Sequence, residues 1–254
     1  MLYRPLFWTS FWAGDWLFTV PAMPYNGAAA ILVSSASTKT TFCLTYLVQK
    51  RNQPGVTVIG LTSKRNLAFT KGLGLYATVH TYDDVKQGLA AAGQGGTWVY
   101  VDTVGNEALN AHICKTLGSR MVRNVSLGVT NLSPAAESKY IMPTSGVTLA
   151  VSAGSNSTSG TPAVEFFFMP EWLSERRRAL AASGIFAMQL KAWTVLMRDC
   201  TSWPASKGPW VAMERLWGVE RVLQKYGEMV KGRVGPEKGT GGRVACKRRR
   251  PGMA

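Results

Sequence analysis

One stretch of the chain, Ala28–Arg65, constrains the fold most, because it joins two short apolar runs through a helical pattern. The first run, Ala29–Ser34, has the composition of a strand that is buried on both faces of a parallel sheet. Lys39–Lys50 is mostly apolar, as expected of a helix, and an Asn-Gln-Pro-Gly turn follows it. Val56–Leu61 is the second apolar run. This order predicts a strand–helix–strand unit in which the two strands are parallel.

The alternation of strand and helix patterns continues beyond this unit and predicts the fold class. Further strands are expected at Ala77–His80, Trp98–Asp102, Met121–Val129 and Val164–Met169. Helices are expected at Asn66–Leu73, Asp83–Ala92, Asn106–Leu117, Glu171–Ser183, Ile185–Met197 and Val219–Met229, and a loop or strand-like excursion at Thr144–Gly160. We therefore predict an α/β protein that has a parallel sheet, helices on both faces and a C-terminal helical extension.

The chain divides into three parts by composition. Residues 1–27 are rich in aromatic side chains but show no clear period, which predicts a linker or a remnant that packs onto a neighbouring element. Residues 28–238 hold the strand and helix patterns and are expected to form the folded domain. Residues 239–254 are rich in glycine and basic side chains and are expected to form a disordered tail.

Charge, apolar runs and cysteines limit the classes of partner. The net charge is +15, but residues 171–254 carry +10 of it, so the charge says little about a ligand of the core. No recognition motif accompanies the basic run Lys247–Arg250, which argues against nucleic-acid binding. Prolines and serines interrupt the uncharged run Trp16–Thr38, which argues against a membrane span or a signal peptide. Four separated cysteines and two histidines argue against a metal site and favour a reduced, cytoplasmic protein.

The turn between the first strand and the first helix is a candidate phosphate site. Main-chain N–H groups at the start of a helix, together with nearby hydroxyls, can hold a phosphate. However, the glycine fingerprint of such turns is absent, and the frame of a P-loop is missing. The alternative is that the hydroxyls only cap the helix. The candidate contacts are Ser35, Ala36, Ser37, Lys39 and Thr40.

The end of the second strand is a second candidate site, formed by Thr62, Ser63, Lys64 and Arg65 without an acidic residue nearby. Sites for NAD(H) usually have an Asp or Glu here, which accepts hydrogen bonds from the ribose hydroxyls. Hydroxyl donors and a guanidinium suit a doubly charged 2′-phosphate instead, so these residues favour NADP(H) over NAD(H). The alternative is a solvated basic turn.

The fourth strand ends in Asp102. A carboxylate suits the hydrophobic interior poorly, so we expect Asp102 at the ligand-facing edge of the sheet. The alternative is a cap for the helix that begins near Asn106. A serine hydrolase is disfavoured, because the chain has only His80 and His112 and lacks a G-x-S-x-G elbow.

Several motifs together carry a family resemblance. They are Ser34–Thr40, Gly60–Asn66, Gly72–Tyr76, Tyr82–Val85, Val101–Asn106, Gly218–Glu220, Gly232–Val234 and Pro236. As a set they resemble the nucleotide-binding half of the medium-chain dehydrogenase/reductase superfamily, in its quinone-reductase-like branch. More closely, they resemble a family of uncharacterised proteins of that type. The resemblance covers residues 5–238.

This resemblance implies a Rossmann-like fold with NADP(H) as its cofactor, and it places Asp102, Val104 and Gly128 beside the nicotinamide. Full-length relatives carry an N-terminal barrel-like domain that supplies half of the substrate cleft. The chain is expected to be N-terminally truncated, so that it starts after that domain. The tail that follows Gly239 resembles nothing in the family.

The sequence therefore predicts an NADP(H)-binding oxidoreductase-like protein of the quinone-reductase type. Hydride transfer to an enone, a quinone or a carbonyl is the expected reaction of an active protein. The alternative is a catalytically inactive nucleotide-binding or interaction protein that lacks its substrate domain. A homodimer is the expected assembly. The sequence identifies neither a catalytic residue nor a proton donor.

Overall fold

The computed structural model describes residues 3–19, 23–85, 89, 96–127, 161–202 and 212–243 of the 254-residue chain. Contacts divide the chain into one unit over Tyr3–Val195 and a second from Leu196 onward. The two units are considered separately below. Three sequence predictions lie wholly or mostly outside the described residues: the excursion at Thr144–Gly160, the site residue Gly128, and residues 86–88 and 90–92 of the helix expected at Asp83–Ala92.

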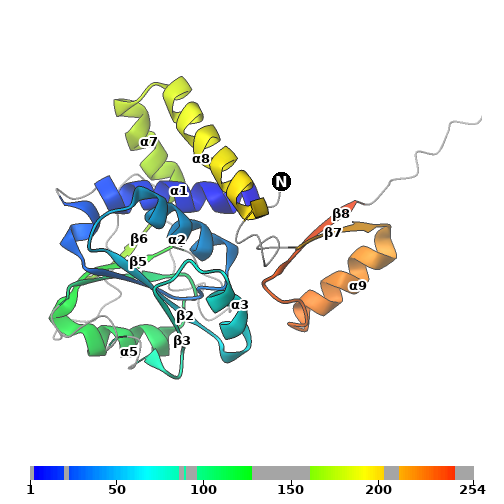
Figure 1. Ribbon diagram of the computed structural model, residues 1–254, viewed down its shortest axis with the longest axis horizontal. Coiled ribbons are helices and arrows are strands. Elements are labelled where there is room, and N and C mark those ends of the chain that lie inside the picture. The colour runs from blue at the N-terminus through cyan, green and yellow to red at the C-terminus, as the bar shows by residue number, and fades with distance from the viewer. Residues whose placement is uncertain are drawn as a thin grey trace, which may run out of the picture. The chain divides into compact units, whose positions relative to one another are not determined.

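The first unit is built on a six-stranded sheet in which every strand pair is parallel. In spatial order the strands run β3-β2-β1-β4-β5-β6 (Figure 1). They are β1 (Ala30–Val33), β2 (Thr57–Thr62), β3 (Thr78–Thr81), β4 (Trp98–Asp102), β5 (Met121–Ser126) and β6 (Val164–Phe166). The chain thus moves outward from β1 to β3 and then returns to the other side of β1. This order confirms the predicted Rossmann-like α/β fold, and it reverses between β1 and β4, which is the position of the ligand crevice in sheets of this kind.

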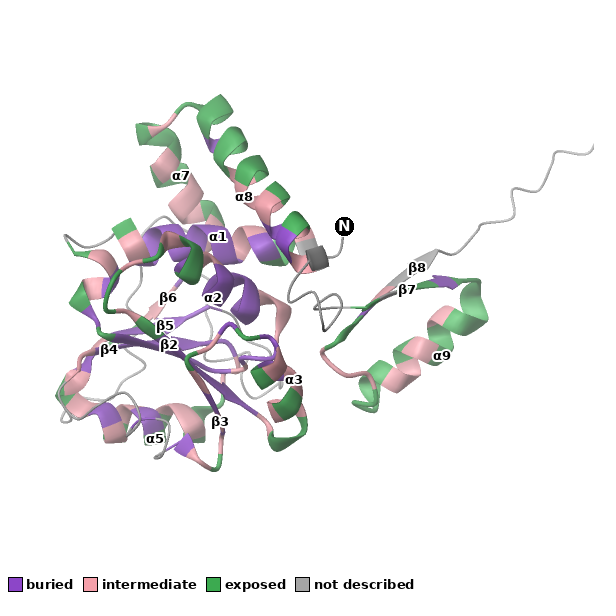
Figure 2. Cartoon of the chain, in the orientation of Figure 1, coloured by how far each residue is buried: buried purple, intermediate pink, exposed green. Residues whose placement is uncertain are grey.

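Helices cover both faces of the sheet, as predicted. Figure 1 shows α1 (Tyr3–Thr19) and α2 (Lys39–Arg51) on one face and α5 (Glu107–Leu117) on the other. The short helix α3 (Leu67–Gly72) joins β2 to β3. Side chains along β1 and β4 are buried throughout, since helices pack on both sides of these central strands (Figure 2).

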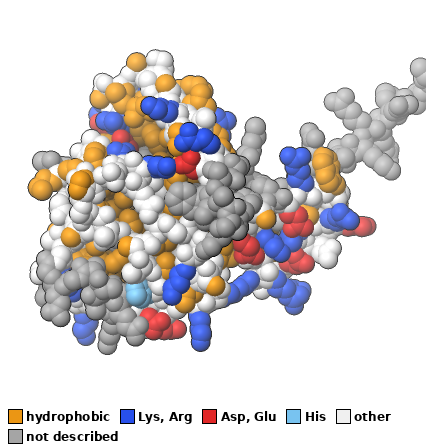
Figure 3. Space-filling model, in the orientation of Figure 1, with side chains coloured by type: hydrophobic (Ala, Val, Ile, Leu, Met, Phe, Trp, Pro, Cys, Tyr) orange, Lys and Arg blue, Asp and Glu red, His pale blue; other side chains and the backbone are white. Residues whose placement is uncertain are grey.

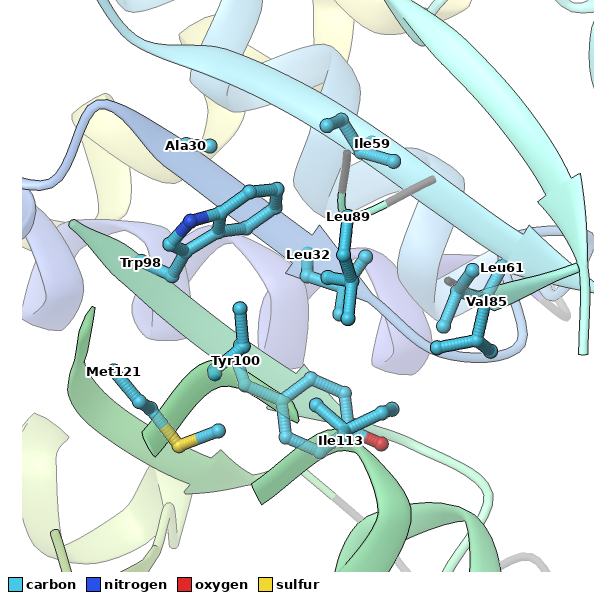
Figure 4. Packing of buried hydrophobic residues seen from close by; sticks show 11 residues of the cluster. Ala30, Leu32, Ile59, Leu61, Val85, Leu89, Trp98, Tyr100, Ile113 and Met121 are labelled. Atoms are coloured by element: carbon cyan, nitrogen blue, oxygen red, sulfur yellow. The ribbon is translucent and has the colours of Figure 1, made fainter. Parts of the chain in front are cut away.

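A continuous apolar core fills the space between the sheet and α5 (Figure 4). Its largest members, Trp98 and Tyr100 of β4, are fully buried and pack with Ile113 of α5. Complete burial of one large apolar side chain contributes about 1.5–3 kcal/mol. The remaining members are Ala30, Leu32, Ile59, Leu61, Val85, Leu89, Leu117 and Met121.

The aromatic N-terminal segment, in which no period was recognised, forms the helix α1 and packs against α2. Its buried Asp15 lies 3.0 Å from Nε of Arg176 and 3.6 Å from the guanidinium of Arg51, and it accepts a hydrogen bond from Nε1 of Trp172 at 3.0 Å. Arg51 belongs to α2, and the other two partners belong to α7 (Met169–Ala179). One carboxylate therefore ties three helices together.

After α7, the helix α8 (Ala182–Ser202) begins in the first unit. The sequence predicted a helix break near Ser183, and the break lies slightly earlier, between Ala179 and Ala182. Hydrophobic side chains gather at the surface over α7 and α8 (Figure 3). On α8, Phe186, Met188 and Leu190 are exposed.

The second unit contains a parallel strand pair, β7 (Ala212–Trp217) and β8 (Lys238–Arg243), joined by α9 (Val219–Val230). The prediction that the chain is disordered from Gly239 onward is therefore wrong for residues 239–243. Their glycine-rich composition is poor for a strand, but pairing with the β7 main chain imposes one. Lys225 of α9 forms ion pairs with Glu214 at 2.9 Å and with Glu228 at 3.1 Å.

Within the described residues, no helix is both long and apolar enough to cross a membrane. The same part of the chain contains no group of three or more potential metal ligands.

Replacing Asp15 with alanine is expected to lower the free energy of unfolding by about 2–4 kcal/mol, because two half-buried arginines lose their counter-charge. Urea unfolding followed by tryptophan fluorescence measures the loss. The matched control is Glu175→Ala, which removes an exposed ion pair with Arg178 and should cost less than about 1 kcal/mol. Equal losses in the two variants would show that the Asp15 cluster does not hold the helices together.

Candidate functional site

The turn between β1 and α2 lies at the carboxyl edge of the sheet, beside the crevice between β1 and β4. Its Ser35 has a left-handed backbone with φ = 50°. A non-glycine residue costs about 1–2 kcal/mol in this conformation. Hydrogen bonds on both sides hold it there: Ala36 N donates to Leu61 O at 2.8 Å, and Thr38 N donates to Ser35 O at 2.8 Å.

A glycine on β2, rather than in the turn, allows the turn to approach the sheet closely. A Cβ atom on Gly60 would lie 2.8 Å from Cβ of Ala36 and 3.0 Å from the ring of Tyr76. The Tyr76 hydroxyl also donates to Ala36 O at 2.7 Å. An isolated glycine within a strand pattern signals such a close approach, and the sequence analysis did not use this signal for Gly60.

The start of α2 is capped by a threonine hydroxyl. Thr38 is the N-cap residue, and its Oγ1 accepts from Thr41 N at 3.4 Å. The capping alternative therefore holds for this hydroxyl. Lys39 and Thr40 follow in the first turn of the helix and are half-buried. The buried Ser37 accepts from Nδ2 of Asn66 at 3.1 Å, which links this turn to the end of β2.

At the end of β2, the four predicted residues do not share one environment. Thr62 is only 1% exposed, and its hydroxyl has no hydrogen-bond partner within the described part of the chain. Ser63 is half-buried, while Lys64 and Arg65 are exposed on a short 3-10 turn, Lys64–Asn66. Burial therefore argues against direct phosphate contact by Thr62, whereas the other three side chains are accessible to a ligand.

Asp102 at the end of β4 is surrounded by protein donors and is 4% exposed. Its Oδ1 accepts from Ser34 Oγ at 2.7 Å and from Val104 N at 2.9 Å. Its Oδ2 accepts from Gly105 N at 3.1 Å and from Nδ2 of Asn110 at 2.7 Å. The cap of α5 is instead Asn106, which accepts from Leu109 N. Asp102 therefore lies at the expected edge, but its carboxylate is engaged within the protein.

Two tyrosines border the same edge. The hydroxyl of Tyr82, which follows β3, accepts from Ser35 N at 3.2 Å. The hydroxyl of Tyr100 donates to Oδ1 of Asn110 at 2.7 Å. Burial raises the pKa of both phenols, and the nearby charge of Asp102 raises both further. Both side chains therefore stay neutral at physiological pH.

The structure thus brings the ends of β1, β2 and β4 together at one edge. The Ser37–Asn66 contact joins the turn after β1 to the basic turn, and the Ser34–Asp102 contact joins it to the end of β4, next to Val104. A parallel sheet whose strand order reverses beside the start of a helix is the arrangement of the Rossmann-like class of α/β folds.

The chain matches the family described as "Protein of unknown function (DUF2855)" over residues 1–235 and belongs to it. This confirms the predicted kinship with an uncharacterised family. No curated protein matches the chain.

Solved structures share the fold. CurA from Vibrio vulnificus, in complex with NADPH, matches with a TM-score of 0.52 and 12% identity, over 94% of this chain and 62% of that one. A further CurA structure from V. vulnificus matches with a TM-score of 0.53 and 12% identity, over 92% and 61%. A probable oxidoreductase from Mycobacterium abscessus matches with a TM-score of 0.52 and 14% identity, over 92% and 59%. The chain therefore spans about three fifths of the length of these proteins, whose fold confirms the predicted resemblance.

Replacing Gly60 with alanine is expected to lower the free energy of unfolding by about 1–3 kcal/mol, since the new methyl group overlaps Ala36. Chemical denaturation measures the change. Gly72→Ala serves as the control, because nothing lies within 4 Å of the added Cβ and alanine favours the helix. If Gly60→Ala is as stable as Gly72→Ala, the turn does not depend on its close approach to β2.

Proposed function

We propose that this protein binds NADP(H) along the carboxyl edge of its sheet and acts as the nucleotide-binding part of an oxidoreductase. The observation that carries the proposal is the connection of three features at one edge: the crevice between β1 and β4, the start of α2, and the exposed basic turn. The contact between Ser37 and Asn66 fixes the last two relative to each other. A dinucleotide needs this combination, because its pyrophosphate and its ribose phosphate are held at adjacent strand ends.

The pyrophosphate would lie against the start of α2. The main chain of Ser35–Thr38 turns here, and α2 begins directly after it, so the positive end of the helix dipole lies at this turn. Lys39 and Thr40 stand in the first helical turn and add a cation and a hydroxyl. Gly60 and Ala36 together permit the close backbone packing that other dinucleotide sites achieve with glycine in the turn.

The 2′-phosphate of NADP(H) would lie against Ser63, Lys64 and Arg65. A doubly charged phosphate is recognised by hydroxyl and guanidinium donors, and Arg65 can supply two parallel N–H groups. Because Thr62–Asn66 contains no acidic side chain, the end of β2 offers no carboxylate to accept hydrogen bonds from the unmodified ribose of NAD(H). The residues at this edge therefore fit the phosphorylated cofactor.

The bound cofactor would supply a hydride, for which an enone, a quinone or a carbonyl is the expected acceptor. The chain's own residues bind and orient the cofactor. Val104 borders the nicotinamide side of the crevice, where Asp102 holds its N–H. CurA, which shares the fold, has been solved with NADPH, and this supports the choice of cofactor class for the proposal.

Replacing Arg65 with alanine should weaken NADPH binding about tenfold or more, because a charge-assisted contact to the 2′-phosphate is lost. NADH binding should be weak and unchanged, since NADH lacks that phosphate. Isothermal titration calorimetry with both nucleotides measures the difference. Lys115→Ala is the matched control, because it removes an exposed basic side chain of α5 on the other face of the sheet. Unchanged NADPH affinity in Arg65→Ala would refute the assigned phosphate site.

Oxidation of NADPH in the presence of a panel of enones, quinones and carbonyls then tests the reaction. Turnover of one class supports an oxidoreductase. Binding of NADPH without any turnover supports the inactive nucleotide-binding protein instead, and failure to bind either nucleotide refutes both.

A further inference from the structure

A polar network crosses the crevice between β1 and β4. It contains Ser34 from the turn after β1, Tyr100 and Asp102 from β4, and Asn110 from α5. We refer to these four residues as the switch-point network. The first three are fully or almost fully buried, and Asn110 is half-buried.

Each hydrogen bond in this network is donated toward the carboxylate of Asp102. Tyr100 donates to Oδ1 of Asn110, which orients the amide so that its Nδ2 faces Asp102. Ser34 Oγ donates to the same carboxylate from the other side. Because the remaining donors are main-chain N–H groups of Val104 and Gly105, both carboxylate oxygens are satisfied within the protein. Asp102 therefore shapes the edge without offering a free acceptor to a ligand.

The network also fixes the spacing of the two loops that border the crevice. Ser34 Oγ accepts from Thr103 N at 2.8 Å, and Ser34 O accepts from Thr103 Oγ1 at 2.9 Å. These bonds lock the turn after β1 to the turn after β4. The basic turn at the end of β2 is linked to the turn after β1 by a different contact, between Ser37 and Asn66. The two ends of the proposed site are therefore held by separate sets of side chains.

We infer that Asp102 and Asn110 are positioning residues for the nicotinamide half of NADP(H), and that the adenosine half binds independently of them. This inference rests on the proposed function. With the 2′-phosphate at the end of β2 and the pyrophosphate at the start of α2, the nicotinamide half must extend toward β4. Its wall is the turn Thr103–Gly105, whose main-chain N–H groups the network holds in place.

Asn110→Ala is the test, because Asn110 donates to Asp102 and does not belong to the turn itself. Its loss removes a charge-assisted hydrogen bond to Oδ2 of Asp102 and so weakens the hold of the network on the turn Thr103–Gly105. Affinity for NADPH should fall about tenfold, while affinity for adenosine 2′,5′-bisphosphate, which lacks the nicotinamide half, should stay within about twofold. Isothermal titration calorimetry with both compounds gives the two values. Equal losses for both, or no loss for either, would overturn the inference.

A second variant and a control distinguish a positioning role of the network from a general loss of structure. Tyr100→Phe keeps the ring in the core and removes only the hydroxyl that orients Asn110, so it should cause a smaller loss that is again confined to NADPH. Asn124→Ala is the control, since it removes another buried amide, on β5, outside the network. It should affect the two compounds equally. If the unaltered protein binds neither compound, the proposed function fails; if it binds both and the variants do not discriminate, only the positioning role fails.

Discussion

The hydrogen bond between Ser34 and Asp102 is the contact on which the carboxyl edge of the sheet depends. It joins residues 68 positions apart in the chain and links the turns after the two central strands at the point where the strand order reverses. A serine hydroxyl and a carboxylate at 2.7 Å form a charge-assisted bond, which is stronger than a bond between neutral groups. Both groups are buried, so water does not compete for them. Buried hydrogen bonds therefore join the turns after β1 and β4 directly.

This side-chain framework replaces the glycines that usually build a dinucleotide turn. Ser35 accepts a left-handed backbone because hydrogen bonds hold the residues on either side of it, and Ala36 packs closely because Gly60 leaves room on β2. The strain at Ser35 is thus compensated by the surrounding structure. A turn of this kind is ordered by many contacts and does not rely on the freedom of glycine.

The sequence was sufficient to predict the positions of the main strands and their parallel direction, because both follow from local patterns of apolar residues. Short apolar runs bounded by turns identified β1, β2 and β4, and the alternation of strands with helices led to the parallel order.

The sequence was less informative about roles at the edge. Asp102 was correctly expected there, but its donors include Ser34 and Asn110, and no local pattern reveals that they saturate the carboxylate. Thr62 looked like a ligand contact, whereas helices cover both faces of the central sheet and leave its side chain buried. The strand β8 was missed because pairing with β7, and not its own composition, makes it a strand.

Asp102 is buried and Arg65 is exposed, and this difference suits the two residues to different roles at this edge. Arg65 lies on an exposed turn, where a charged side chain can exchange water for a phosphate at small cost. Asp102 is buried, and there a carboxylate is stable only when donors surround it. A negative charge so placed would repel an anionic ligand if it were free. Ser34, Asn110 and two main-chain N–H groups donate to both carboxylate oxygens and stabilise the charge, so the carboxylate organises the wall of the crevice. Selectivity for the cofactor is therefore expected to reside in the exposed turn, and the geometry of the crevice in the buried network.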